Sequence, residues 1–366
     1  MSERGAPATI RDVARRAGVS TATVSRVLAG IGNPKAATAD AVMAAVEALD
    51  YRPSAVARSL RMRRTGTIGL IVTDIQNPFF PELVQAADDA ARRVGYSILL
   101  GSAAYDERRA VHYLDLMADR RVDGMIVASS QVSDESWRWL AAAPVPVVVV
   151  NAEPANVPIT VIASDNRGGM RTAAEHLISL GHRRMAYIRG DAGITADLPR
   201  LEGFRAACRD AGIPDSDVIE LRGDALFEGG ERAVRELLAS GSRVTAIACH
   251  NDITAIGALR ALRAAGVRVP QQVSVIGCDD IAAASWVVPA LTTVAQQKAQ
   301  MGRMAVERLL AMLDAGSGGI APETIRVPMV LEVRESTGLA PVGAAATGAS
   351  RDGNADNHQP QAGAAG

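Results

Sequence analysis

The sequence has little of what metal sites and disulfide frameworks require. Its 366 residues include three cysteines, Cys208, Cys249 and Cys278, which form no CxxC pair and fit a reducing compartment. Among its five histidines, His176 and His182 stand six positions apart, too far to share one helix face as a ligand pair. We therefore expect no disulfide, no metal site and no cofactor.

Long apolar runs are also absent. The segment PVPVVVV at 144–150 is far shorter than the roughly 18–20 residues needed to cross a bilayer, and it predicts a buried strand. The N-terminus is polar and has no apolar signal core. No phosphate loop, dinucleotide fingerprint or nucleophile elbow appears. These absences predict a cytoplasmic protein that has no membrane partner and is not an enzyme.

The positive charge is unevenly distributed. Residues 1–66 carry eleven lysines and arginines against five acidic residues, a net charge of +6. Because the whole chain has a net charge of −1, the remainder carries −7. A cationic end on an acidic body indicates a terminus suited to the phosphates of nucleic acid.

Residues 9–28, TIRDVARRAGVSTATVSRVL, carry the pattern of two short helices joined by a tight turn. Thr9 and Asp12 are spaced as a capping box, Gly18 provides the turn, and Ser20 caps the second helix. This arrangement is typical of a helix-turn-helix, whose second helix reads bases in the major groove. An ordinary small helical domain is the alternative. On the second helix we expect four side chains to share the exposed face: Thr21, Ala22, Ser25 and Arg26.

The next segments continue this basic module. TADAVMAAVEALDY predicts a third helix, which ends before Pro53. Residues 54–62 predict a short amphipathic helix surrounded by arginines, too short to be stable alone and therefore expected to order against a partner. A plain charged linker is the alternative interpretation of this segment.

From residue 67 the pattern alternates between short apolar strands and helices of ten to fifteen residues. Such alternation predicts parallel sheets with helices on both faces, arranged as two doubly wound α/β lobes, the second beginning near residue 164. Ligands of such sheets bind beyond the carboxyl ends of the strands.

We expect a head at 1–53, a hinge helix and linker at 54–66, a core at 67–340 and a disordered tail at 341–366.

Eight segments in order make the chain resemble the lac/gal repressor family of bacterial transcription regulators. The resemblance extends from about Thr9 to about Leu339. The segments are TIRDVARRAGVSTATVSRVL, YRPSAVARSL, IGLIVTDIQNPFF, GHRRMAYIRG, RLEGF, HNDITAIGAL, VSVIGCDD and PALTTV. The resemblance implies an all-α helix-turn-helix head and a core like the periplasmic sugar-binding proteins. It also implies a homodimer that binds a near-palindromic operator and a small effector that changes its affinity for DNA.

The resemblance also assigns roles to individual residues. Thr21, Ala22 and Arg26 fall on base-reading positions, and Arg26 matches the acceptor pair of guanine. Ala57 and Leu60 fall on the hinge-helix positions that enter the minor groove, where a leucine wedge would kink the duplex. Exposed helix filler is the alternative for Thr21 and Ala22.

In the core, the resemblance places an effector cleft at the strand ends. Its implied lining residues suit the hydroxyl groups of a sugar, polyol or nucleoside, and the two phenylalanines are expected in a strand-end loop where they can stack on a ring. They are Phe79, Phe80, Asn151, Arg200, Asn251, Asp279 and Trp286. Two departures stand out. Cys278 replaces a common aromatic residue, and ITADL at 194–198 lacks the arginine and threonine of purine-binding members, which disfavours a purine corepressor.

These observations predict a ligand-responsive, dimeric DNA-binding regulator, and more specifically a repressor. A sugar-binding receptor of the periplasmic type is the first alternative, which the basic head and the missing signal segment disfavour. A catalytic α/β domain acting on sugars is the second alternative, and it lacks a catalytic constellation. The sequence does not choose between induction and corepression.

Overall fold

The computed structural model describes seven stretches of the chain: 8–28, 34–51, 64–129, 133–152, 157–191, 193–316 and 319–341. The chain divides into two compact units, one comprising residues 1–67 with 120–123 and the other comprising 68–119 with 124–366. The predicted hinge helix at 54–62, with Ala57 and Leu60, lies outside the described residues, as does nearly all of the predicted tail. No helix within the described stretches combines the length and apolar character that crossing a membrane requires.

The first unit contains three helices, α1 (Ile10–Ala17), α2 (Thr21–Leu28) and α3 (Ala36–Ala48). The predicted capping box is present at α1, where the amide and hydroxyl of Thr9 donate to Asp12 Oδ2 over 2.9 and 2.6 Å. At α2 the Thr23 amide donates to Ser20 Oγ, as predicted. The helices enclose a small apolar core made of Val13, Ala14, Val24, Val42 and Ala45.

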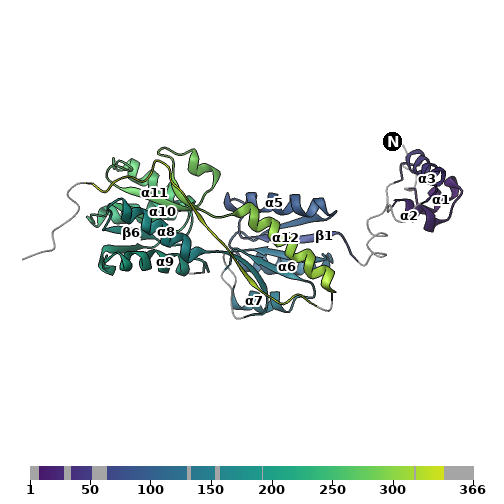
Figure 1. The fold of residues 1–366 in the computed structure, drawn as a ribbon, viewed down its shortest axis with the longest axis horizontal. Helices are drawn as coiled ribbons and strands as arrows, with labels where there is room; N and C mark the ends of the chain where they lie inside the picture. Colours follow the sequence, from purple (N-terminus) through teal and green to yellow (C-terminus); the bar gives the residue numbers. More distant parts are fainter. Residues whose placement is uncertain are drawn as a thin grey trace, which may run out of the picture. The chain divides into compact units, whose positions relative to one another are not determined.

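The second unit contains two six-stranded sheets, each at the centre of one lobe (Figure 1). The first sheet has the order β11-β5-β4-β3-β1-β2 and all of its strands are parallel where their pairing is recorded. Its strands are β1 (Thr67–Val72), β2 (Ser97–Ser102), β3 (Gly124–Ala128), β4 (Val147–Val150), β5 (Thr160–Ser164) and β11 (Thr324–Val327).

The second sheet has the order β12-β10-β9-β8-β6-β7, and only β12 pairs antiparallel. Its strands are β6 (Met185–Ile188), β7 (Val218–Leu221), β8 (Ala246–Cys249), β9 (Ser274–Asp279), β10 (Thr292–Ala295) and β12 (Val330–Glu332). The expectation of two doubly wound lobes is therefore confirmed.

Helices cover both faces of each sheet, so each lobe has an apolar layer on either side of its strands. The helices of the first lobe are α5 (Phe79–Arg93), α6 (Glu107–Asp119), α7 (Asp134–Ala141) and α12 (Lys298–Ala315). Those of the second lobe are α8 (Asn166–Ser179), α9 (Asp197–Asp210), α10 (Phe227–Ala239) and α11 (Asp252–Ala264), with the short 3₁₀ helices η1 (Asp215–Asp217) and η2 (Ala282–Ser285).

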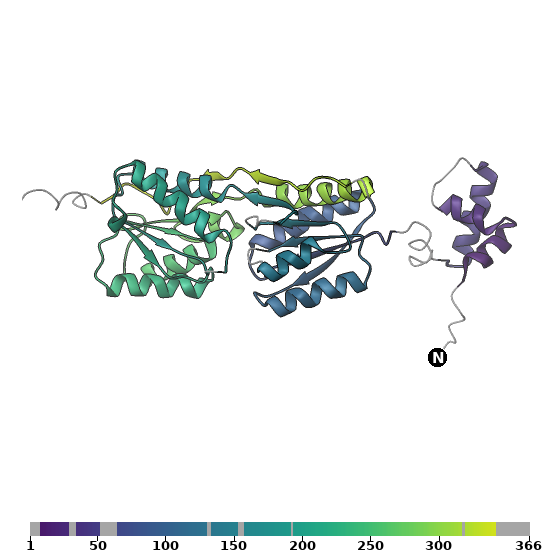
Figure 2. The same cartoon turned by 90° about the horizontal axis from the view of Figure 1, so that it is seen from below.

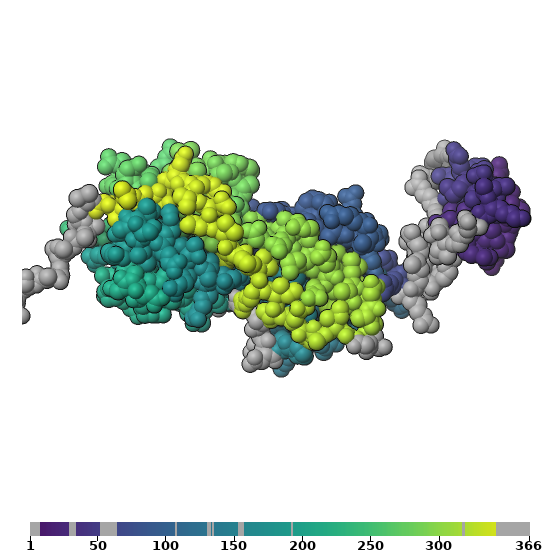
Figure 3. All heavy atoms as spheres, in the orientation of Figure 1, coloured from purple at the N-terminus to yellow at the C-terminus, as the bar shows by residue number. Residues whose placement is uncertain are grey.

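The lobes are not consecutive in sequence, which differs from the expectation that one simply follows the other. The chain passes between them after β5, after β10 and after β11 (Figure 2). Helix α12 returns to pack on α5 in the first lobe, through Met301, Ala305 and Leu309. In the space-filling view, α12 and the strands after it lie on the surface along both lobes (Figure 3). The crossings matter because residues close to them can contact both lobes.

Candidate functional site

The helix expected to read DNA presents three of its four predicted side chains to solvent. Thr21, Ala22 and Arg26 are exposed on α2. Ser25 is only 8% exposed, so the expectation that it shares this face was wrong. The buried side of α2 includes Ser25 beside Val24, because successive residues on a helix are only 100° apart and α2 packs against both α1 and α3.

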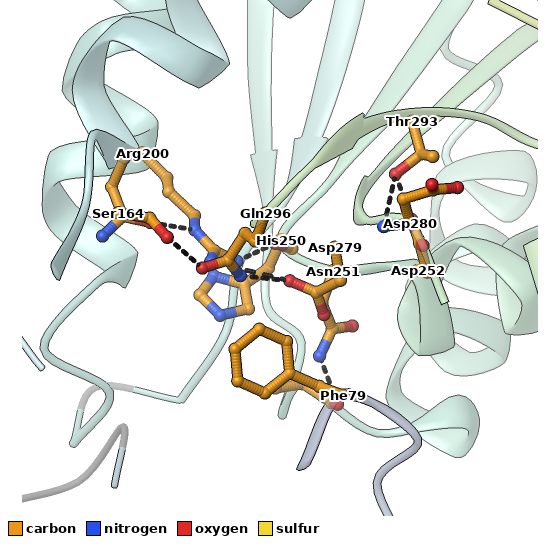
Figure 4. A network of polar contacts seen from close by, with 12 residues as sticks. Phe79, Ser164, Arg200, His250, Asn251, Asp252, Asp279, Asp280, Thr293 and Gln296 are labelled. Atoms are coloured by element: carbon orange, nitrogen blue, oxygen red, sulfur yellow. Dashed lines mark hydrogen bonds and ion pairs between the residues drawn. The ribbon is translucent and has the colours of Figure 1, made fainter. Parts of the chain in front are cut away.

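A cavity in the second unit gathers most of the predicted effector residues. Its empty volume, including the space open to solvent, is about 380 Å³, and residues of both lobes line it. The lining residues are Asn77, Phe79, Phe80, Tyr105, Asn151, Ile194, Ala196, Arg200, Ala225, His250, Asn251, Asp279 and Gln296. Figure 4 shows Arg200, His250, Asn251, Asp279 and Gln296 grouped beside the ring of Phe79. Six of the seven predicted effector residues therefore lie together, as the strand-end rule predicts.

The two phenylalanines lie at the start of α5 and not in a loop. The side chain of Asn77 accepts a hydrogen bond from the Phe79 amide at 3.0 Å, and α5 begins at Phe79. The rings of Phe79 and Phe80 meet edge to face with centroids 5.1 Å apart. Both are buried in the core of the first lobe, so the first turn of α5 fixes them rigidly at the cavity wall.

Arg200 projects from α9 and is 3% exposed. Its guanidinium donates to Asn166 Oδ1 at 2.8 Å and to the His250 carbonyl at 2.5 Å, and it lies 3.7 Å from Asp279 Oδ1. Because a guanidinium carries five donors, these contacts hold its plane and leave further N–H groups for the cavity. Arg200 is thus a cation fixed in place before any ligand arrives.

Asp279 ends β9 and joins a polar chain that passes between the lobes. Gln296 follows β10 at a crossing; its amide donates to Asp279 Oδ1 at 2.5 Å, and its oxygen accepts from the Ser164 hydroxyl at 2.5 Å. Ser164 ends β5 in the first lobe. Burial raises the pKa of Asp279, and Arg200 opposes that rise. The carboxylate is therefore held between the arginine and a link to the other lobe.

The two predicted asparagines differ in what they can offer a ligand. Asn251 caps α11: its oxygen accepts from the Thr254 amide at 2.9 Å, and its amide donates to the Ala225 carbonyl at 2.9 Å. Asn151 follows β4, is 9% exposed, and its Oδ1 is buried without a hydrogen-bond partner. A buried acceptor without a donor is costly, so Asn151 is better placed than Asn251 to receive a ligand hydroxyl.

In the cavity wall, Nδ1 of His250 lies 3.2 Å from Oδ1 of Asp197. Burial lowers the pKa of His250, which keeps the imidazole neutral. Burial acting alone would raise the pKa of Asp197, but the neighbouring His250 and the hydrogen bonds from the Gly190 amide and Arg189 lower it to about 2. The ionised Asp197 thereby fixes the start of α9, the helix that carries Arg200.

A third buried carboxylate, Asp252, lies beside the site and outside its lining (Figure 4). It accepts from the Thr293 hydroxyl at 2.5 Å and from the Ile281 amide at 2.9 Å. Burial, together with the charge of Asp279, raises the pKa of Asp252 to about 7. Within the described residues, no cluster of three or more His, Cys, Asp or Glu side chains is arranged to hold a metal ion.

Seven of the thirteen lining residues were not among the predicted effector residues, and Trp286 was misplaced. The seven are Asn77, Tyr105, Ile194, Ala196, Ala225, His250 and Gln296. His250 and Gln296 immediately follow β8 and β10, so the strand-end rule could have found both. Tyr105 lies in the loop after β2. Trp286 is 76% exposed and does not line this cavity, because η2 stands between it and the end of β9.

Comparisons with known proteins agree with this architecture. A family model described as "Bacterial regulatory proteins, lacI family" matches residues 9–54, and one described as "Periplasmic binding protein-like domain" matches residues 174–337. The ribose operon repressor of Escherichia coli (strain K12) is 39% identical over 304 residues, 83% of this chain and 92% of that protein. The transcriptional repressor PurR of Haemophilus influenzae (strain PittEE) is 37% identical over 314 residues, covering 86% and 93%.

A solved structure shares the fold over nearly the whole chain. It is the Lac repressor dimer bound to operator and the anti-inducer ONPF, with a TM-score of 0.82 and 29% identity. The match covers 92% of this chain and 100% of that one. Both the head and the two-lobed core are therefore found together in a known protein.

Proposed function

This chain belongs to the lacI family of bacterial regulatory proteins, and from that premise we propose that its cavity binds an uncharged, polyhydroxylated effector. Family membership makes it a ligand-responsive, DNA-binding transcriptional regulator. The proposal concerns the finer points: which class of molecule binds, which residues hold it, and that the chain acts as a cytoplasmic homodimer without enzymatic activity. The receptor alternative is not favoured for a chain with this head.

The observation that carries the proposal is the pairing of opposite charges in one buried wall. The opposite charges of Arg200 and Asp279 neutralise each other. A charged ligand would therefore find no unpaired opposite charge in this wall, and burying its charge would be costly. Guanidinium donors and carboxylate acceptors together match vicinal hydroxyls, each of which donates and accepts. The unpartnered Asn151 Oδ1 provides one further acceptor for a hydroxyl or amino group.

The apolar part of the cavity supports a sugar over a purine base. Phe79 offers an aromatic surface for the carbon-bound face of a sugar ring. Ile194 and Ala196, from the ITADL segment, line the cavity and contribute no side-chain hydrogen bond that would read the edge of a purine. The name of one relative, the ribose operon repressor, makes D-ribose the first compound to try.

The exposed surface of α2 supports base recognition by Arg26, with Thr21 and Ala22 beside it. A dimer would place two such helices on a near-palindromic operator; the solved Lac repressor, a dimer bound to its operator, supports this arrangement. Ser25 is withdrawn from this set because of its burial, and Ala57 and Leu60 stay predictions from the sequence.

The effector is tested by thermal unfolding of the full chain with D-ribose, other pentoses, hexoses, polyols, nucleosides, purine bases and sugar phosphates. A ligand at about 100 times its Kd adds about 2.7 kcal/mol to the free energy of unfolding, which gives a clear rise in Tm. We expect uncharged sugars or nucleosides to produce this rise and Asp279→Asn to abolish it. A rise with sugar phosphates alone would contradict the proposal, and so would no rise with any compound.

DNA reading is tested on an operator selected from random duplexes with the full chain. Arg26→Ala is expected to cost about 1–3 kcal/mol at one base pair and to relax the preference there. Arg16→Ala, an exposed arginine on α1, is the matched control and should leave the base preference unchanged. Equal relaxation by both variants would show that Arg26 supplies charge alone.

A further inference from the structure

The backbone around Asp279 has a conformation that its sequence does not favour. Asp279 has φ 128° and Asp280 has φ 55°, two consecutive positive values at residues other than glycine. Side chains of L-residues crowd the backbone in this region, and such conformations persist only where the surroundings hold them. Something near the effector cavity must therefore hold residues 279–281.

Lys298 holds the carbonyl side of this segment. Its ammonium donates to the Asp279 carbonyl at 2.7 Å and to the Asp280 carbonyl at 2.9 Å. The side chain is buried, and it is one of only two lysines in the sequence. Lys298 is also the first residue of α12, where a cation opposes the helix dipole. Helix stability therefore does not explain a lysine here, whereas the two carbonyl contacts do.

Asp252 holds the amide side of the same segment. Its Oδ2 accepts from the Ile281 amide at 2.9 Å, and its Oδ1 accepts from the Thr293 hydroxyl, which itself accepts from the Asp280 amide at 3.4 Å. The carboxylate occupies the space above Gly277, where a Cβ would stand 2.2 Å from Oδ1. Lys298 therefore binds carbonyl groups, and Asp252 binds an amide group, of the same short backbone segment.

Lys298 also reaches the first lobe. Its Nζ lies 3.3 Å from Glu82 Oε2 on α5. Phe79, at the cavity wall, is three residues earlier on the same helix, so the two residues lie on neighbouring turns of one face. One buried ammonium therefore touches both the loop that follows the cavity aspartate and the helix that carries the cavity phenylalanine.

We propose that Lys298 is a positioning residue for effector recognition, which holds the strained backbone of residues 279–281 against Asp252 and ties it to α5 through Glu82. The inference rests on the proposed effector site. Neither Lys298 nor Asp252 lines the cavity, so both act through the direction in which Asp279 presents its carboxylate.

A comparison of Asp280→Gly with Asp280→Ala measures the strain directly. Both variants remove the Asp280 carboxylate and its 2.6 Å ion pair with Arg334, so they differ in backbone freedom alone. With Lys298 present, the alanine variant should have an unfolding equilibrium constant roughly five- to tenfold larger than the glycine variant, since only glycine accepts φ 55° without a Cβ clash. Urea unfolding of the full chain gives both constants.

The same pair is then measured in the Lys298→Met background. If Lys298 holds the strained conformation, the segment relaxes without it, and the difference between glycine and alanine should fall to within about twofold. An undiminished difference would overturn the proposal, because the lysine would then contribute packing without acting on this backbone. Should K298M not fold, Thr293→Val replaces it, since it removes the hydroxyl that receives the Asp280 amide and keeps the side-chain shape.

The cycle requires no effector. If the difference between glycine and alanine at position 280 does not fall in the Lys298→Met background, the role of Lys298 is overturned and the effector site stays as proposed. If no compound raises the Tm, the effector site is overturned and the measured backbone strain still holds. With a compound that binds, K298M should weaken its affinity at least about tenfold. An unchanged affinity would show that the strained segment does not serve effector recognition.

Discussion

The two walls of the cavity are built on different principles. The first lobe contributes Asn77, Phe79, Phe80, Tyr105 and Asn151, none of which carries a formal charge at neutral pH, and burial raises the pKa of Tyr105 further. The second lobe contributes Arg200 and Asp279, both almost completely buried. One wall therefore supplies shape and an aromatic surface, and the other supplies charge.

The walls also differ in how far their polar groups are already satisfied. Arg200 and Asp279 are bonded to neighbours that fix their direction, so their electrostatic field exists before a ligand arrives. Asn151 on the first wall keeps an unpartnered buried acceptor. Preorganised charge favours specific recognition, whereas an unsatisfied acceptor is a cost that only a ligand can remove. The first wall is thus the one that gains most from binding.

Removing the cation of the second wall has the largest expected effect on this contrast. Arg200→Met leaves the Asp279 carboxylate buried without the guanidinium beside it and removes the donor to the His250 carbonyl. We expect the free energy of unfolding to fall by about 3–5 kcal/mol, measured by urea unfolding, with loss of the ligand-induced rise in Tm. Arg167→Met, which breaks an exposed pair with Glu202, is the control and should cost at most about 1 kcal/mol. Equal costs would contradict a preorganised second wall.

Asp252, the buried carboxylate beside the second wall, should make the stability of the protein depend on pH. The folded protein, with a pKa of about 7, holds this proton more tightly than the unfolded chain, whose value is near 3.8. The stabilising contribution is therefore complete below about pH 4 and is lost as the pH rises through 7. Asp252→Asn should remove this slope, which is at most about 1.4 kcal/mol per pH unit, in urea unfolding at a series of pH values.

Asp197 provides a control of opposite sign for that titration. Its pKa is lowered to about 2, so its contribution is present above about pH 4 and is lost as the pH falls toward 2. Asp197→Asn should therefore change the profile below pH 4 and leave the slope between pH 4 and 7 parallel to that of the parent. If Asp197→Asn also removed the slope between pH 4 and 7, Asp252 would not be the group that causes that slope.

On the first wall, Phe79→Leu should weaken affinity more than it weakens the fold. The change removes the ring from the cavity but leaves an apolar side chain, so we expect about a tenfold loss of affinity for the best-binding compound and a cost of about 1 kcal/mol in stability. Phe204→Leu removes the same volume from the core of the second lobe, away from the cavity lining. Calorimetric titration that shows equal affinity losses would exclude ring stacking.

The contrast between the walls was only partly visible in the sequence. The family resemblance assigned Asn151 and Asp279. Their positions agree with the strand-end rule, because the carboxyl ends of parallel strands meet at one edge of a sheet. The fold class followed from the alternation of short apolar strands and helices. What the alternation did not reveal is the return of α12 to the first lobe, since a helical pattern does not say which sheet the helix covers.

The misplaced residues have specific local causes. Trp286 was assigned by the family resemblance, but η2 separates it from the strand end. Ser25 lies one residue from the apolar stripe of α2, and two packing partners widen that stripe enough to bury it. The strands β11 and β12 have four and three residues, too few for an alternating pattern to be read. Tertiary packing, absent from any local pattern, decided each case.

The smallest effect concerns the cost that Asn151 imposes on the free protein. Asn151 has φ 62° as well as its unpartnered oxygen, so Asn151→Gly removes both a crowded Cβ and a buried acceptor. We expect the ligand-free protein to gain about 1 kcal/mol in free energy of unfolding while affinity for the best compound falls.

Ala225→Gly is the matched control on the second wall, because Ala225 lines the cavity with φ 63° and has no polar side chain. It should gain only about half as much, from backbone relief alone, and keep its affinity. Equal gains in the two variants would show that the Asn151 oxygen costs nothing, and the first wall would then have no advantage to gain from a ligand.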